Sequence, residues 1–128
     1  SIVEFMHYLE ESRLIHLLHR NTKGIGRMRK PENLYLRHPN LHYALALHSA
    51  EKGAIRESFF ISQAGAKHQI AYTEDGDFML NEKYIIEVGG ANKDAGQIRG
   101  LQNAFIAADN IEAGYKNKIP LWLFGFLY

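Results

Sequence analysis

Residues 76–90 have the sequence GDFMLNEKYIIEVGG, which predicts two neighbouring strands joined by a tight turn. Asp77 begins the first of these strands, and Glu87 interrupts the apolar run of the second. An ionised carboxylate in a buried strand is costly unless it is paired, hydrogen-bonded or bound to a metal. The partner of Glu87 is therefore the first question to answer.

The length of the connecting loop decides whether the two carboxylates face each other. A two-residue loop would pair Asp77 with Ile86 and place Glu87 on the opposite face of the sheet. A three-residue loop, Asn81 to Lys83, sets Asp77 opposite Glu87 with Cβ atoms about 5 Å apart. It also sets Phe78 opposite Ile86 and gathers the apolar side chains on the other face. We therefore predict the three-residue loop.

Two facing carboxylates repel each other unless a proton or a cation lies between them. Mg²⁺ suits such a pair, because it binds one or two carboxylates and keeps several waters. Asp77 and Glu87 are therefore the predicted metal ligands. The alternative is a solvent-facing acidic pair that nearby lysines balance, since structural ion pairs also perturb carboxylates.

The rest of the chain alternates between helical and strand patterns, as expected of a mixed α/β domain. Apolar residues recur at helical spacing from Ser1 to about Arg20, which predicts one long first helix. The strong turn signal at 74–76 separates the strand that begins at Asp77 from a further strand before it. Strands are expected at 34–36, 69–73, 77–80, 83–88, 104–108 and 121–126, and further helices at about 41–47, at about 55–64 and through Ile98, Leu101 and Gln102.

Size and composition narrow the class of protein. The 128 residues suffice for one domain, and a net charge of +1 gives no overall attraction to nucleic acid or a membrane. The absence of cysteine excludes disulfides and thiolate metal sites, and it fits a cytoplasmic location. The apolar run 119–128 is too short to span a bilayer, so no membrane is expected. Both ends of the chain are abrupt, which indicates a piece of a longer protein.

Several segments follow one another in a familiar order. They are Arg56-Glu57-Ser58-Phe59-Phe60, Gly76-Asp77-Phe78, Ile86-Glu87-Val88-Gly89-Gly90-Ala91-Asn92-Lys93, Gln97-Ile98 and Ile119-Pro120-Leu121-Trp122-Leu123-Phe124-Gly125. With them, the chain from about Asn33 onward resembles the C-terminal domain of unknown function in bacterial and archaeal AAA-type ATPases. That domain in turn resembles the PD-(D/E)XK (restriction-endonuclease-like) nuclease superfamily.

The resemblance implies a fold and a division of the chain. Residues 31–128 would form a nuclease-like α/β domain, a restriction-endonuclease-like mixed sheet flanked by helices. Residues 1–30 would be an N-terminal helix and a basic connector. This helix resembles the end of the winged-helix segment that precedes the domain in such ATPases.

The resemblance also implies roles for individual residues. Glu57 matches the helical acid of the nuclease core, and Asp77 and Glu87 match its two strand carboxylates. In that chemistry the carboxylates hold Mg²⁺, which activates water and stabilises the charge on a phosphate. A lysine normally follows two residues after the second acid, but this chain has Gly89 there. Lys93 is the nearest substitute, because the Gly-Gly break could fold it back toward the site.

The supporting residues also have simpler explanations. Lys93 would otherwise solvate the start of the next helix. Gln97 would bind a phosphate or the carboxylate of Glu87, or else remain a surface side chain. Glu57 would otherwise pair with a neighbouring cation on its own helix.

A basic connector is the candidate surface for nucleic acid. Lys23, Arg27, Arg29 and Lys30 place four positive charges in eight residues, which suits phosphate contacts, although a solvated linker has the same composition. No P-loop pattern is present, so ATP would bind a missing N-terminal ATPase domain of the same protein. Ser58 has no histidine at a suggestive spacing, so a hydrolase triad is not indicated.

Two functions follow from these observations. The first is metal-dependent hydrolysis of phosphodiester bonds in nucleic acid by the C-terminal domain of an AAA-type ATPase. The second is a catalytically inactive module of the same fold, which binds nucleic acid or a protein and directs the ATPase. Gly89 in the usual lysine position favours the second function. The three acids Glu57, Asp77 and Glu87 favour the first.

Overall fold

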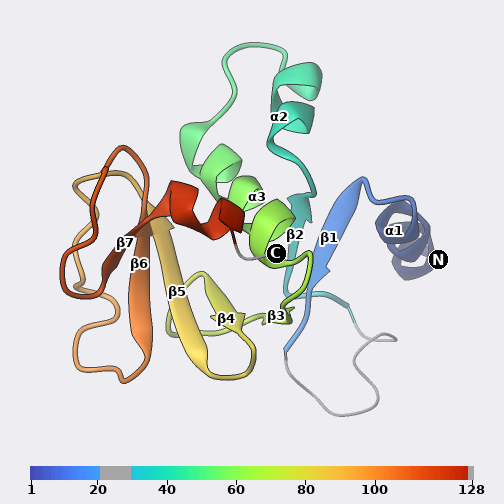
Figure 1. Cartoon of the computed structure of the whole chain (residues 1–128). Helices are drawn as coiled ribbons and strands as arrows, with labels where there is room; N and C mark the ends of the chain where they lie inside the picture. The colour runs from blue at the N-terminus through green and yellow to red at the C-terminus, as the bar shows by residue number, and fades with distance from the viewer. Residues whose placement is uncertain (21–29, 127–128) are drawn as a thin grey trace.

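The structure is a computed structural model that describes residues 1–20 and 30–126 (Figure 1). Lys23, Arg27 and Arg29 lie outside the described residues, whereas Lys30 is described and exposed. The chain forms a mixed α/β structure with a two-stranded and a five-stranded sheet. Within the described part of the chain, no helix has both the length and the apolar character needed to cross a membrane.

The first helix is shorter than the sequence predicts. Helix α1 covers Ile2–Glu11, and Arg13 just after it has a left-handed φ of 62°, which ends the helix. The following residues, Ile15–Leu18, form strand β1 and pair antiparallel with β2, Asn33–Leu36. The prediction of one helix to about Arg20 is therefore wrong, because pairing with a distant segment decides the state of this apolar run.

The main sheet has the order β3-β4-β5-β6-β7. The first three strands form an antiparallel meander, and β6 and β7 continue it in parallel to β5. Phe78 lies opposite Ile86 and Leu80 opposite Tyr84, so the predicted three-residue loop and these pairs are confirmed. The direct strand pairing of Asp77 with Glu87 is not formed, because β4 begins at Phe78 and the N–H of Asp77 donates to Ile86. The strands are β3 Ile70–Ala71, β4 Phe78–Leu80, β5 Tyr84–Gly89, β6 Ala104–Ala108 and β7 Lys118–Pro120.

Helix α3, Lys52–Ala64, lies over the main sheet, and α2, Pro39–Leu45, packs against α3 and β2 (Figure 1). The fully buried Phe60 of α3 stacks on Phe78 of β4 with ring centroids 5.1 Å apart, and it meets Phe124 edge-on at the same distance. These aromatic contacts fix α3 against the meander that carries the two strand carboxylates.

Two predictions in the last third of the chain are wrong. Residues 92–102 form a series of turns instead of a helix, and Gly100 there has a left-handed φ of 81°. Residues Leu121–Phe126 form the 3₁₀-helix η2 instead of a strand. Leu121 and Phe124 are its buried residues, and a three-residue spacing suits a 3₁₀-helix. Short apolar runs of this kind do not distinguish a strand from a helix.

Candidate functional site

Asp77 lies immediately before β4 and is fastened to β5 by its backbone and its side chain. Its N–H donates to the carbonyl of Ile86 at 3.0 Å, and its Oδ2 accepts the N–H of Val88 at 2.7 Å. Burial raises the pKa of Asp77 above its ordinary value, and the nearby charge of Glu87 also raises it, whereas the Val88 N–H opposes the rise. Asp77 therefore has a fixed orientation beside Glu87.

Glu87 lies in the middle of β5 and is only 2% exposed. Its Oε1 forms an ion pair with Lys93 Nζ at 2.8 Å. Its Oε2 is buried and has no hydrogen-bond partner among the described residues. An unpaired buried acceptor loses its solvation without compensation. Only half of this carboxylate is therefore satisfied by the described protein groups.

Gly89 makes the space that Lys93 occupies. A Cβ at position 89 would lie 2.7 Å from Lys93 Cγ and 2.8 Å from Lys93 Cβ. The stem of the lysine thus lies against the bare backbone of Gly89, and its ammonium turns back to Glu87. The hydrogen bond to Glu87 raises the pKa of Lys93, so the ammonium stays charged. The absence of a side chain at Gly89 thus lets Lys93, four residues further along the chain, reach Glu87.

Glu57 brings the third predicted acid to the same place from helix α3. Burial raises the pKa of Glu57 to about 7, and the charges of Asp77, Glu51 and Glu87 contribute to the rise. The predicted carboxylates from one helix and two strands therefore interact. Gln97 is exposed, and within residues 1–20 and 30–126 no hydrogen bond links its side chain to these acids.

We call Glu57, Asp77 and Glu87 the acid cluster. Tyr35 of β2 lies near it and was not predicted from the sequence. Burial raises the pKa of its hydroxyl to about 12, with further contributions from the charges of Glu57 and Asp77. Its ring packs against Phe78 with centroids 5.4 Å apart. Tyr35 lies more than 40 residues from Asp77 in sequence, and no local pattern marks it as a member of the site.

The acid cluster fits a metal through two carboxylates and not through a larger ligand set. Across the described ranges, no group of three or more His, Cys, Asp or Glu side chains is arranged to hold a metal ion. Mg²⁺ needs only one or two carboxylates and completes its shell with water. The unpaired Oε2 of Glu87 and the adjacent carboxylate of Asp77 are consistent with that mode, so the metal prediction for these two residues stays a prediction.

Ser58 does contact a histidine, which no spacing in the sequence predicts. His42 Nε2 lies 2.7 Å from Ser58 Oγ, across 16 residues of sequence. Ser58 is fully buried, so a substrate has no access to its hydroxyl. The pair joins α2 to α3 and does not form a nucleophile.

Comparison of the chain with protein-family models, with curated proteins and with solved structures finds no match. The function proposed below therefore rests on the geometry of the acid cluster and on the resemblance described above.

The raised pKa of Glu57 predicts how stability depends on pH. Between about pH 4.5 and about pH 7, folded Glu57 keeps a proton that the unfolded chain releases, so stability falls as pH rises through this window. Glu57→Gln removes this loss. We expect the variant to have a higher melting temperature than the wild type at pH 8, and little difference at pH 4, measured by circular dichroism.

Glu51→Gln is the matched control on the same helix, with the opposite sign. Glu51 caps α3 by accepting the N–H groups of Ala54 and Gly53, which lower its pKa. Its stabilisation is present above the unfolded-state pKa and is lost as pH falls. Glu51→Gln should therefore lower the melting temperature at pH 8. A Glu57→Gln variant that is also destabilised at pH 8 would contradict the assignment of a desolvated carboxyl.

Proposed function

We propose that this chain is a nuclease-like domain that hydrolyses phosphodiester bonds of nucleic acid with a divalent metal ion. The observation that carries the proposal is the meeting of Asp77, Glu87 and Lys93, with one buried oxygen of Glu87 left unpaired. Two adjacent carboxylates can hold a divalent metal ion, and a neighbouring ammonium can offset negative charge on a phosphate. Glu57 supplies a third acid from α3.

The architecture supports the same assignment. Glu87 lies in β5 of the five-stranded mixed sheet, Asp77 lies just before β4 and is bonded to β5, and Glu57 comes from α3. We infer that the fold is restriction-endonuclease-like and that the chain is the C-terminal domain of an AAA-type ATPase. ATP would then bind an N-terminal domain of the same protein, and the expected location is the cytoplasm.

The three acids and Lys93 would have different roles in the reaction. Asp77 and Glu87 would hold Mg²⁺, which when bound activates water and stabilises negative charge on a phosphate. The N–H of Val88 holds the Asp77 carboxylate in place. Lys93 would offset negative charge on the substrate phosphate as a mobile point charge. Glu57, with a pKa of about 7, can exchange a proton near neutral pH and so suits a general acid or base.

A catalytically inactive module that binds nucleic acid or a protein and directs the ATPase is the second candidate. The observation that favours it is the ion pair itself, since Lys93 already neutralises Glu87 within the protein. In that case the cluster would be structural, and metal would not be needed.

The test is cleavage of single- and double-stranded DNA and RNA in Mg²⁺ or Mn²⁺, together with Mn²⁺ binding by calorimetry. We expect metal-dependent cleavage that Glu87→Gln and Asp77→Asn each reduce at least 100-fold, because each removes a metal ligand. Glu112→Gln, at an exposed loop position, is the matched control and should cleave normally. Cleavage that survives Glu87→Gln, or the absence of both Mn²⁺ binding and cleavage, would overturn the enzymatic proposal in favour of the inactive module.

A further inference from the structure

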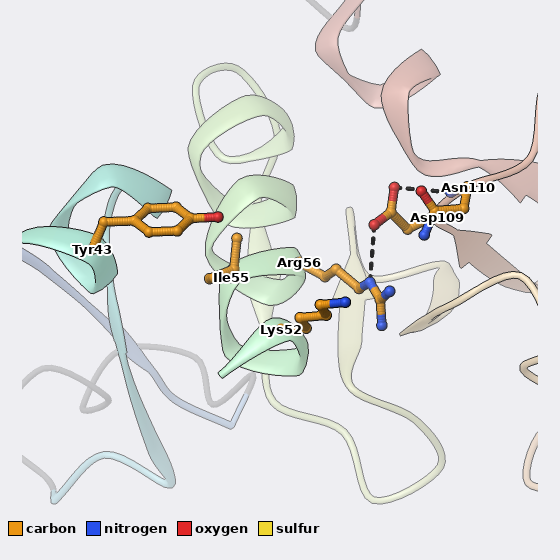
Figure 2. A pocket seen from close by; sticks show the side chains of 6 residues that line it. All are labelled: Tyr43, Lys52, Ile55, Arg56, Asp109 and Asn110. Atoms are coloured by element: carbon orange, nitrogen blue, oxygen red, sulfur yellow. Dashed lines mark hydrogen bonds and ion pairs between the residues drawn. The ribbon is translucent and has the colours of Figure 1, made fainter. Parts of the chain in front are cut away.

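Two adjoining hollows lie beside helix α3, away from the residues of the acid cluster. The first has a volume of about 250 Å³ and is lined by Tyr43, Lys52, Ile55, Arg56, Asp109 and Asn110 (Figure 2). The second, of about 260 Å³, extends over Phe59 and Leu121 to Trp122. Both are lined by Ile55, Arg56 and Asp109, so they adjoin along the same side of α3. We call the two hollows together the α3 groove.

The groove lies where ligands commonly bind in α/β proteins. Asp109 directly follows β6, and its N–H donates to the carbonyl of Gly89, the last residue of β5, at 2.8 Å. The groove is therefore at the carboxyl ends of two parallel strands, a position that favours ligand sites. Arg56 precedes Glu57 on α3, and its guanidinium lies 3.3 Å from the position of a Cβ at Gly90. The α3 groove and the acid cluster thus share helix α3 and the end of β5, but none of the three acids lines the groove.

Among the side chains that line the groove, the two cations Lys52 and Arg56 outnumber the one carboxylate of Asp109, although Glu51 at the start of α3 also interacts with Arg56. Lys52 and Arg56 lie one helical turn apart on the same side of α3, where two like charges repel. Arg56 Nε bonds Asp109 Oδ2 at 3.0 Å, and Asp109 Oδ1 in turn accepts the N–H of Asn110. Lys52 has no ion pair within the described ranges of the chain. An anion placed between the two cations would compensate the remaining charge.

Asp109 also fixes the direction of the arginine. The pair uses Nε, so the two terminal nitrogens of Arg56 are not engaged with Asp109. Figure 2 shows these nitrogens and the Lys52 ammonium on the same side of the groove. A guanidinium held in one orientation binds a phosphate with less loss of side-chain freedom than a mobile one.

Each of the two hollows has one exposed aromatic ring in its lining. Tyr43 of α2 is 67% exposed, and Trp122 of η2 is 50% exposed. Nucleic-acid bases stack on exposed rings of this kind, while cations between them contact the backbone. Each hollow is slightly smaller than a typical small-molecule site, so a single nucleotide unit suits it better than a large cofactor.

We propose that the α3 groove binds a short single-stranded segment of nucleic acid. A phosphate contacts Lys52 and Arg56, one base stacks on Tyr43, and a neighbouring base stacks on Trp122. For its biological role this inference rests on the proposed function, because the groove would hold the strand that the acid cluster would cut. The binding itself needs neither a metal ion nor cleavage.

Trp122 provides a direct measurement, because it is the only tryptophan in the sequence. A short oligodeoxythymidylate is titrated into the protein in the presence of a chelator, and tryptophan fluorescence is recorded at several salt concentrations. We expect quenching that saturates. Tyr43→Ala should weaken binding about tenfold through the loss of stacking. Lys52→Ala should weaken binding. It should also reduce the slope of the logarithm of the binding constant against the logarithm of the salt concentration by about 0.7, because one phosphate contact is lost.

Matched controls separate the groove from general surface charge and aromaticity. Lys67→Ala and Tyr115→Ala change exposed residues that do not line either hollow, and both should bind as the wild type does. Tyr43→Phe should also bind normally, since it keeps the ring. A second titration uses a proline-rich peptide, the other class of ligand that aromatic grooves accept.

Three results would overturn the inference: no quenching by the oligonucleotide, equal weakening by Lys67→Ala and Lys52→Ala, or quenching by the peptide alone. The outcomes also separate this inference from the proposed function. Saturable quenching without any metal-dependent cleavage supports the groove and counts against the enzyme. Cleavage without quenching counts against the groove alone.

Discussion

Lys93→Met is expected to lower the free energy of unfolding by about 2 kcal/mol and to abolish metal-dependent cleavage. Removing one partner of a buried ion pair typically costs about 3–5 kcal/mol, because the other charge stays buried without compensation. The side chain of Lys93 is 37% exposed, so water screens part of the interaction and the smaller figure applies. Methionine keeps an unbranched stem over Gly89, so the measured loss reports mainly the missing charge.

A double-mutant cycle in urea denaturation isolates the pair. The cycle combines Lys93→Met with Glu87→Gln, and the double variant should be more stable than Lys93→Met alone because no bare carboxylate remains. Lys83→Met, in the exposed turn between β4 and β5, is the matched control and should change stability little. If Lys93→Met costs no more than Lys83→Met, the ion pair does not compensate Glu87.

The sheet register was predictable because local features determine it. The alternation of apolar residues and the length of the turn both lie within residues 77–88, and the structure has the same pairing. The state of Ile15–Leu18 depends instead on β2, which follows in the chain only after the connector. An isolated apolar run of that length fits a helix or a strand, and only its distant partner decides between them.

Some residues of the candidate site were likewise predictable from their local sequence, whereas others are brought there only by contacts between distant segments. Glu57, Asp77 and Glu87 were identifiable from a motif, because each lies in a segment with a characteristic neighbourhood. Tyr35 is brought to the acids by the packing of β2. The Arg56–Asp109 pair joins residues 53 positions apart. Such contacts depend on how helices cross the sheet, and no spacing in the sequence records them.

Gly89→Ala should separate Lys93 from Glu87, although it adds only one methyl group. The new Cβ would lie 2.7 Å from Lys93 Cγ and 2.8 Å from its Cβ, at the base of the side chain. Rotation of the ammonium end cannot relieve contacts there, so the whole lysine must move and the 2.8 Å ion pair breaks. We expect a net loss of about 1–2 kcal/mol, since the lower entropy of the unfolded chain offsets part of the cost.

Gly90→Ala is the matched control for this glycine. The nearest atoms to its new Cβ are the terminal nitrogens of Arg56 at 3.3 and 3.4 Å, the mobile end of a long side chain. This variant should leave both the ion pair and cleavage intact. Equal effects of Gly89→Ala and Gly90→Ala on urea denaturation would show that the close approach of Lys93 to Gly89 does not matter.

Moving the lysine tests whether position 93 replaces the usual lysine position. Residues 87 and 89 point to the same face of β5, so a lysine introduced by Gly89→Lys can reach Glu87 once Lys93→Gly has removed the whole side chain, including the Cβ that would lie 2.8 Å from the new one. Gly89→Lys alone should destabilise the protein and stop cleavage, because two lysines compete for one volume and one carboxylate. Gly89→Lys combined with Lys93→Gly should recover much of the stability and the cleavage. Recovery of stability without cleavage would identify the lysine as a purely structural partner of Glu87, as the inactive module requires.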